Sequence, residues 1–317
     1  MKTTFNYNFD QSIRIEAPGT VANLVCGFDI LGLCLHEPFD HMEMRLLPEK
    51  KIVIHSLDEY RLPAEPAQNT AGAALIDMME KEGIDCGFEV WIRKQIKPGS
   101  GLGSSAASAA GAVAGANYLL GNPFSSNELV SFAMAGEKLA SGVKHADNVA
   151  PCIMGGITLV RGIFPLDIVK LDHPPLFLSV VHPQIEVKTS DARQVLRKQV
   201  ALKDAIRQWG NIAGLVAGLL QKDIPLIGRS LEDVIIEPAR SMLIPGFDDV
   251  KKNALAAGAL GGGISGSGPS LFMLSDTAET ATRVKVVMED VFEKIRIPYH
   301  SYLTTINDGG IRIEEMH

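Results

Sequence analysis

Apolar and polar residues alternate in several short segments of the first half of the chain. This period of two is typical of half-buried β-strands, and it occurs in SIRIEA (12–17), HMEMRLL (41–47), KIVIHS (51–56) and GFEVWIRK (87–94). Helical spacing of apolar residues predicts a helix over 69–82. An Ala-rich segment predicts a second helix over 104–120, and a Ser/Asn cap followed by Glu128 predicts a third over about 126–141.

The pattern changes near 161–175, where RGIFPLDIVKLDHPP contains three prolines and few helix formers. We place a domain boundary there, which divides the chain into residues 1–165 and 166–317. Beyond the boundary, the patterns predict a buried strand at 176–183, two helices within 189–220, a strand in SLFMLS and a helix over 277–295. Strands with segregated helices indicate an α+β chain of two domains.

Composition narrows the class of protein. The 317 residues are 46% hydrophobic and 21% charged with a net charge of −7, which excludes a disordered chain and argues against nucleic acid as the main partner. The N-terminal residues have no apolar signal segment, and no run reaches the ~18 apolar residues that span a membrane. The four cysteines form no CxxC pair, so we expect small buried side chains in a reducing, cytoplasmic protein.

The stretch PGSGLGSSAASAAGAVAGAN (98–117) carries the strongest chemical signal. Three glycines after a strand lead into a helix that opens at Ser104 and Ser105, and unpaired N–H groups at a helix N-terminus suit phosphate. The pattern GxxxxGK[ST] is absent, so this is not a Walker A loop. The alternative is a tight turn followed by a small-residue helix packed closely on a sheet.

These residues resemble the nucleotide-phosphate motif of the GHMP small-molecule kinases. APGTVANLVCGFDILGLCL (17–35) is similar to the substrate motif of the homoserine branch of that family, and GGGISGSGPSLFML (261–274) to its third motif. SGVKHADNVAPCIMGG (141–156) and EPARSMLIPGF (237–247) point to the same branch. One departure is visible: the branch usually reads SANLGPGFD, and Val21, Val25 and Cys26 replace its Ser, Gly and Pro.

The resemblance implies an N-terminal domain like ribosomal protein S5 domain 2, with a left-handed βαβ unit, and a C-terminal ferredoxin-like domain. It implies ATP-dependent phosphorylation of L-homoserine to O-phospho-L-homoserine for threonine biosynthesis, in a cleft between the domains. It also implies a homodimer. Two alternatives are a GHMP kinase for another small alcohol and a ligand-sensing relative without activity.

The resemblance also assigns the ATP and metal ligands. It implies ATP contacts from Asn69 and from the loop residues Pro98, Gly99, Ser100, Gly101, Leu102, Gly103, Ser104, Ser105 and Ala106. Glu137 lies on the apolar side of its predicted helix, so its carboxylate is either paired in a salt bridge or bound to a cation. The resemblance makes Glu137 a Mg²⁺ ligand beside a loop serine, Ser105 or Ser104.

Homoserine carries an ammonium, a carboxylate and a hydroxyl group. The resemblance implies that Asp29 and Asn23 hold the ammonium, that Arg193 and Arg240 bind the carboxylate with Thr189 nearby, and that Gly266 and Ser267 close over the substrate. From the residues alone, either arginine could instead be a solvated surface charge. His145 and Asn148 are expected at the acceptor hydroxyl. An amide accepts no proton, so either Asp147 or the γ-phosphate takes the proton of the hydroxyl, and this alternative stays open.

Overall fold

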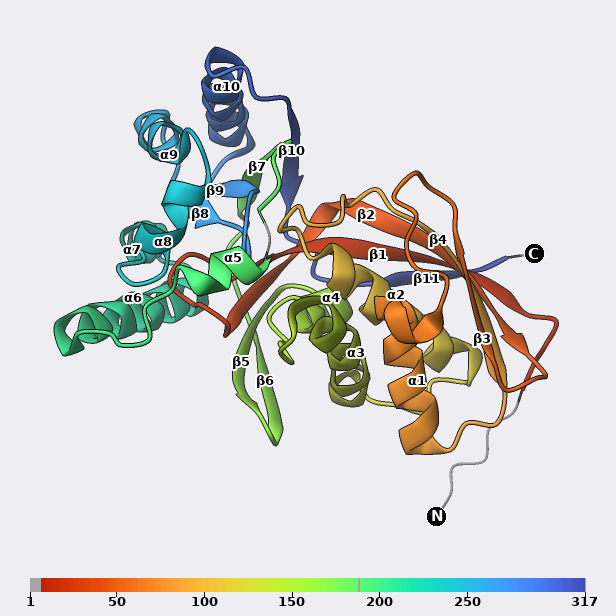
Figure 1. Cartoon of the computed structure of the whole chain (residues 1–317). Coiled ribbons are helices and arrows are strands. Elements are labelled where there is room, and N and C mark those ends of the chain that lie inside the picture. The colour runs from red at the N-terminus through yellow and green to blue at the C-terminus, as the bar shows by residue number, and fades with distance from the viewer. Residues whose placement is uncertain (1–6, 188, 317) are drawn as a thin grey trace.

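The computed structural model of the chain describes residues 7–187 and 189–316, apart from the side chains of residues 189 and 190. Two domains lie side by side (Figure 1). The first contains a seven-stranded sheet in the order β11-β1-β2-β4-β3, with the β5–β6 hairpin attached to β2. Its strands are β1 (Ser12–Ala22), β2 (Leu31–Leu47), β3 (Ile52–Ser56), β4 (Gly87–Arg93), β5 (Ile157–Ile163), β6 (Leu166–Leu171) and β11 (Arg312–Met316).

Helices cover one side of this sheet (Figure 1). They are α1 (Thr70–Glu82), α2 (Ser104–Leu119), α3 (Ser126–Ser141) and α4 (Val149–Met154), with a 3₁₀ turn at Pro66–Gln68. The three long helices confirm the predictions, and Ser125 and Glu128 form the capping box that begins α3. The central helix α2 approaches the sheet closely, because a side chain at Gly115 would come within 2.4 Å of Ile15.

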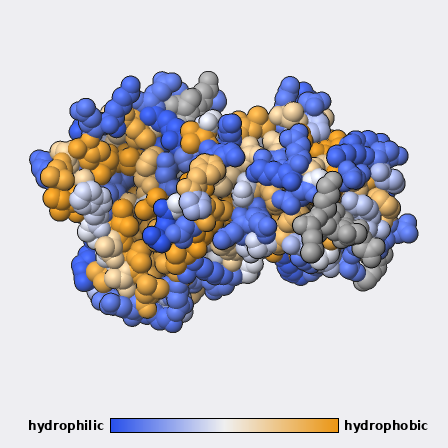
Figure 2. Space-filling view, turned by 90° about the horizontal axis from the view of Figure 1, so that it is seen from below, coloured by the Kyte–Doolittle hydropathy of each residue, from blue (hydrophilic) through white to orange (hydrophobic). Residues whose placement is uncertain are grey.

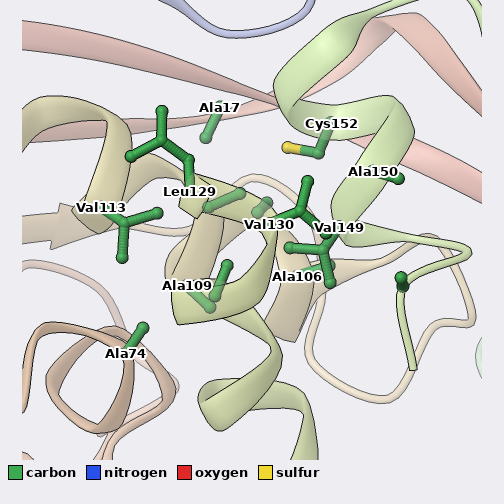
Figure 3. Close-up of a cluster of buried hydrophobic side chains, with 14 of the residues drawn as sticks. Ala17, Ala74, Ala106, Ala109, Val113, Leu129, Val130, Val149, Ala150 and Cys152 are labelled. Carbon is green, nitrogen blue, oxygen red and sulfur yellow. The ribbon is translucent and has the colours of Figure 1, made fainter. Parts of the chain in front are cut away.

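Small apolar side chains fill the space between these layers. Figure 3 shows part of this core, in which Ala106, Ala109 and Val113 of α2 face Leu129 and Val130 of α3. Alanine and glycine let the helices pack at short distance, so the alternative interpretation of the small-residue helix is also correct. Tight packing of α2 fixes the position of its N-terminus.

The second domain contains a four-stranded antiparallel sheet in the order β10-β7-β9-β8. This order is that of a ferredoxin-like fold, as expected. The strands are β7 (Phe177–Pro183), β8 (Gly261–Ile264), β9 (Leu271–Ser275) and β10 (Tyr299–Thr305). The helices are α5 (Thr189–Gln194), α6 (Leu202–Gln221), α7 (Ile224–Ser230), α8 (Glu237–Arg240), α9 (Phe247–Ala256) and α10 (Ala278–Lys294), with a 3₁₀ turn at Ser241–Leu243.

The first sheet crosses the predicted boundary at 165/166. Ile163 pairs with Leu166 inside the β5–β6 hairpin, and β11 returns from the C-terminus to pair with β1. The division into 1–165 and 166–317 stays a prediction, and the residues of β6 and β11 belong to the first sheet. Such pairing joins strands far apart in sequence, so a local change in composition does not reveal it. The handedness of the β3–α1–β4 unit, whose two strands are parallel neighbours, also stays a prediction.

Two surface features complete the description. None of the helices in the described ranges is long and apolar enough to cross a membrane. In the view of Figure 2, hydrophobic residues gather over the half of the molecule that holds the second domain. Helix α6 in that domain exposes Leu202, Ile206 and Trp209, whose exposed fractions are 68%, 56% and 60%.

Candidate active site

A cavity of about 380 Å³ lies where the two domains meet. Most of the residues that the sequence singled out line it: Asn23, Asp29, Asn69, Pro98, Gly99, Gly101, Gly103, Ser104, Ser105, Glu137, His145, Asn148, Arg193, Arg240, Gly266 and Ser267. The side chains of Ser100, Leu102 and Ala106 are buried in the loop and in α2 and do not line it. The side chain of Thr189 lies outside the described part of the chain.

The glycine loop before α2 needs its glycines. Gly99, Gly101 and Gly103 have φ values of 78°, 85° and 70°, in the left-handed region that favours glycine. A side chain at Gly101 would come within 2.6 Å of the carbonyl oxygen of Ser265, whose own hydroxyl donates to the carbonyl of Gly101 at 2.7 Å. The loop therefore lies directly against the third glycine motif, and the N-terminus of α2 opens at the cavity.

The two serines at the start of α2 have different partners. Ser104 donates its hydroxyl to the backbone carbonyl of Ile96 at 2.7 Å, and its side chain is nearly buried. Ser105 donates to Oε1 of Glu137, also at 2.7 Å. Of the two hydroxyls, the one of Ser105 thus lies beside the carboxylate.

Glu137 projects from α3 with 5% of its surface exposed. Burial raises the pKa of its carboxyl group, and the hydrogen bond from Ser105 opposes that rise. Within the described residues no cationic side chain pairs with Glu137, which argues against the salt bridge considered for it. A buried carboxylate with a hydroxyl beside it is a hard-oxygen pair of the kind that binds Mg²⁺ together with water and phosphate oxygens.

The sequence did not reveal a buried ion pair under the glycine loop. Lys94, at the end of the strand before the loop, pairs with Asp40 and donates to the carbonyl of Ser104 at 2.7 Å and to the hydroxyl of Ser108 at 2.9 Å. Asp40 also accepts from the backbone N–H groups of Gln95 and Ile96. A lysine at a strand end just before a glycine loop was the available signal. The pair holds the loop and the start of α2 together.

At the opposite side of the cavity, the chain between β1 and β2 forms a tight turn. Asn23 donates from its amide to the carbonyl of Gly266 at 2.9 Å and accepts from the backbone N–H of Asp29 at 3.0 Å. Asn23 and Asp29 both have positive φ values, 75° and 60°. The amide of Asn23 thus ties the turn to the third glycine motif and orients Asp29.

Three charged or polar groups meet beside this turn. Arg193 from α5 donates to Oδ1 of Asp29 at 3.3 Å and to Nε2 of His145 at 2.6 Å. An arginine only donates, so Nε2 of His145 accepts, and a neutral ring carries its proton on Nδ1. The pKa of His145 is lowered, first by burial and then by the two arginines, with Asp29 opposing them. Neutral His145 is therefore the form in this site.

Arg240 is a buried arginine, with 4% of its surface exposed, and not the solvated surface charge considered for it. Its Nε donates to the carbonyl of Ala192 and its Nη1 to the carbonyl of Gly266, each at 2.9 Å. Burial lowers its pKa, and the nearby Asp29 opposes this effect. Arg240 and Arg193 thus place two guanidinium groups near the carboxylate of Asp29 at this end of the cavity.

The HADN segment (145–148) contributes two further groups. The hydroxyl of Thr20 donates to Oδ1 of Asn148 at 2.7 Å and so sets the orientation of the amide. Asp147 lines the cavity although only 4% of its surface is exposed. Burial, followed by the charges of Asp29 and Glu137, raises the pKa of Asp147 to about 7. Whether Asp147 or the γ-phosphate takes the proton of the hydroxyl stays open.

Known proteins match the chain over nearly its whole length. Residues 69–156 match the family described as GHMP kinases N terminal domain, and residues 215–294 match GHMP kinases C terminal. Homoserine kinase of Chloroherpeton thalassium is 47% identical over 292 residues, which covers 88% of this chain and 92% of the relative. Homoserine kinase of Methanocella arvoryzae is 40% identical, with 94% and 96% covered.

Solved structures agree with these sequence matches. The crystal structure of homoserine kinase from Cytophaga hutchinsonii has a TM-score of 0.93 and 49% identity, covering 98% of this chain and all of that one. L. major mevalonate kinase in complex with R-mevalonate, at 15% identity and a TM-score of 0.68, shares the fold. Both halves of the family and the whole architecture are present, and the chain belongs to the GHMP kinase family.

Proposed function

We propose that this protein transfers the γ-phosphoryl group of ATP to the hydroxyl of L-homoserine and forms O-phospho-L-homoserine, a step of threonine biosynthesis. One observation carries the proposal: a single cavity joins the glycine loop at the N-terminus of α2 to Asp29, Arg193 and Arg240. The first end suits a polyphosphate and the second a zwitterionic amino acid. Several relatives that are 43–47% identical carry the name homoserine kinase.

At the phosphate end, the backbone N–H groups of the loop and of the first turn of α2 bind the phosphates of ATP. Gly99 has no atom within 4 Å of the position that its Cβ would take, so the backbone is open to a ligand there. Glu137 and Ser105 would hold Mg²⁺, which supplies neutralisation of the charge on the transferring phosphoryl group. Lys94 and Asp40 hold this loop in place through the contacts described above.

At the amino-acid end, the charged side chains of the pocket form an ion pair with each other, which a bound substrate would replace. Asp29 and Arg193 lie 3.3 Å apart, and the ammonium and carboxylate of homoserine would take one partner each. Arg240 adds a second donor for the carboxylate, and Thr189, Gly266 and Ser267 lie on segments that border the substrate. The ammonium then pairs with Asp29 and the carboxylate with Arg193, so neither buried charge is left without a partner. An amino acid that carries both groups is therefore expected to bind best.

The acceptor hydroxyl would lie at the HADN segment. Asn148 hydrogen-bonds this hydroxyl with its amide held by Thr20, and neutral His145 stands next to it between Asp29 and Arg193. Phosphoryl transfer depends mainly on positioning and charge neutralisation, which these residues provide without covalent chemistry.

A coupled assay of ADP release tests the proposal. We expect turnover with L-homoserine that depends on Mg²⁺ and clearly exceeds turnover with mevalonate or galactose. ATP without an acceptor serves as the control for hydrolysis. Faster release with mevalonate or galactose would mean that the homoserine assignment is wrong while the family assignment stands.

We propose in addition that the protein is a cytoplasmic homodimer. The exposed apolar stripe of Leu202, Ile206 and Trp209 on α6 supports self-association, because a patch of this kind is covered in most soluble proteins. The four free, buried cysteines suit a reducing compartment. Light scattering of the purified protein tests the dimer, with Trp209→Glu as the variant expected to shift it to a monomer.

A further inference from the structure

The aromatic ring of Phe28 lies beside both arginines of the cavity. The guanidinium carbon of Arg240 is 4.9 Å from the ring centroid, and that of Arg193 is 6.0 Å from it. Both distances fall within the range in which a cation is attracted to an aromatic face. Phe28 belongs to the first domain, whereas α5 and α8, which carry the arginines, belong to the second.

The turn that carries Phe28 is held firmly on both sides. Gly27 donates its N–H to the carbonyl of Asn23 at 2.8 Å, and its own carbonyl accepts from Ile30 and Leu31 at 3.0 and 2.9 Å. A side chain at position 27 would come within 2.4 Å of Leu31, so the backbone there admits glycine alone. The turn therefore fixes the backbone from which the ring of Phe28 projects.

The two guanidinium groups need an attractive neighbour. They carry like charges in a partly buried site, and Arg193 is among the causes that lower the pKa of Arg240. Asp29 forms an ion pair with Arg193, and Arg240 is held by backbone carbonyls. In the part of the chain that the structure describes, Nε of Arg193 is buried without a hydrogen-bond partner. The face of Phe28 supplies attraction for both cations without using any N–H donor.

We propose that Phe28 is a positioning residue, whose ring holds the guanidinium groups of Arg193 and Arg240 together, with donors free for the carboxylate of an amino-acid substrate. This inference rests on the proposed function, because it names the recognition of that substrate. The ring also connects the two domains at the cavity. Loss of the π face therefore weakens binding of the carboxylate and leaves the ATP end of the cavity unchanged.

Fluorinated phenylalanines at position 28 test the attraction without changing the shape of the ring. Stepwise replacement by 4-fluoro-, 3,5-difluoro- and 3,4,5-trifluorophenylalanine withdraws electron density from the face and weakens binding of a cation. We expect the KM for L-homoserine to rise with each step, to a total of about threefold to thirtyfold. The KM for ATP and kcat should stay within about twofold of the parent enzyme.

Phe164 provides a matched control, because Lys144 lies 5.8 Å from its ring centroid, outside the cavity. Fluorination there should leave every kinetic constant unchanged. Phe28→Leu should raise the KM for homoserine at least as far as full fluorination, and Phe28→Tyr, which keeps a π face, should restore most of the affinity. Arg240→Ala serves as the positive control, and full fluorination should have a smaller effect in that background.

The outcomes separate the two proposals. A parent enzyme that turns over mevalonate or galactose faster than homoserine overturns the proposed function itself. A parent enzyme that prefers homoserine, but whose KM for homoserine does not change along the fluorinated series, overturns the role of Phe28. An equal rise of the KM for ATP and for homoserine would show a general structural role for the ring and would also overturn the proposal.

Discussion

Replacing Asp147 by Asn should stabilise the ligand-free protein, and more so as the pH rises. Burial raises the pKa of this carboxyl from its ordinary value of 3.8 to about 7 in the folded protein. The folded state therefore binds the proton more tightly than the unfolded state, and stability is lost as the pH rises from 3.8 to about 7. Since each pKa unit corresponds to about 1.4 kcal/mol, the ionised carboxylate costs about 4 kcal/mol above this range.

Urea unfolding of the wild type and of Asp147→Asn at pH 5 and pH 8 measures this cost. Asn has the shape of Asp and no charge, so the variant should have a higher free energy of unfolding than the wild type. We expect this difference to be roughly 3 kcal/mol larger at pH 8 than at pH 5. Asp85→Asn is the control, because the side chain of Asp85 is 86% exposed and meets water in both states. Equal pH dependence of the wild type and Asp147→Asn would refute the reasoning.

Two further predictions concern the phosphate end of the cavity. Glu137→Gln keeps an acceptor for the hydroxyl of Ser105, so the melting temperature without ligand should stay level or rise. Turnover should fall about a hundredfold or more, equivalent to ~2.7 kcal/mol. A lower melting temperature with activity kept would return Glu137 to a structural role. Ser105→Ala should lower turnover and Ser104→Ala should lower the melting temperature, because only Ser104 hydrogen-bonds the buried loop backbone at Ile96. Equal and negligible losses in the two serine variants would contradict that division.

Local features were predicted well from the chain alone. The three long helices of the first domain begin and end close to their predicted bounds, since caps and apolar periodicity act within a few residues. The first ten residues of β2 were missed, because residues 31–35 are buried on both faces and do not alternate, and two consecutive exposed residues, His36 and Glu37, follow them. Strands β5, β6, β8, β10 and β11 and helices α4, α7, α8 and α9 were also not predicted.

In the site, too, features set by neighbouring residues were predicted and contacts between distant residues were not. Its contiguous motif, the glycine loop with its two serines, and the family resemblance of the separate segments identified most of the residues that line the cavity, but not Leu62, Lys94 or Ser108. Which serine faces Glu137 was left open, because a helix start places both near the site and only the packing of α2 against α3 selects Ser105. The pair of Lys94 and Asp40 joins residues 54 positions apart and follows no motif.

The sequence by itself determined the long helices α1, α2, α3, α6 and α10, part of the strands, the phosphate loop and the family, because these depend on neighbours along the chain. Tertiary structure alone decided the contacts of Asp29 and His145 with Arg193, which join residues 164 and 48 positions apart. It also decided that Phe28 of one domain lies against arginines of the other. Such contacts form only when two sheets and their helices pack together, and the low exposure of that packed site is what raises the pKa values of Asp147 and Glu137.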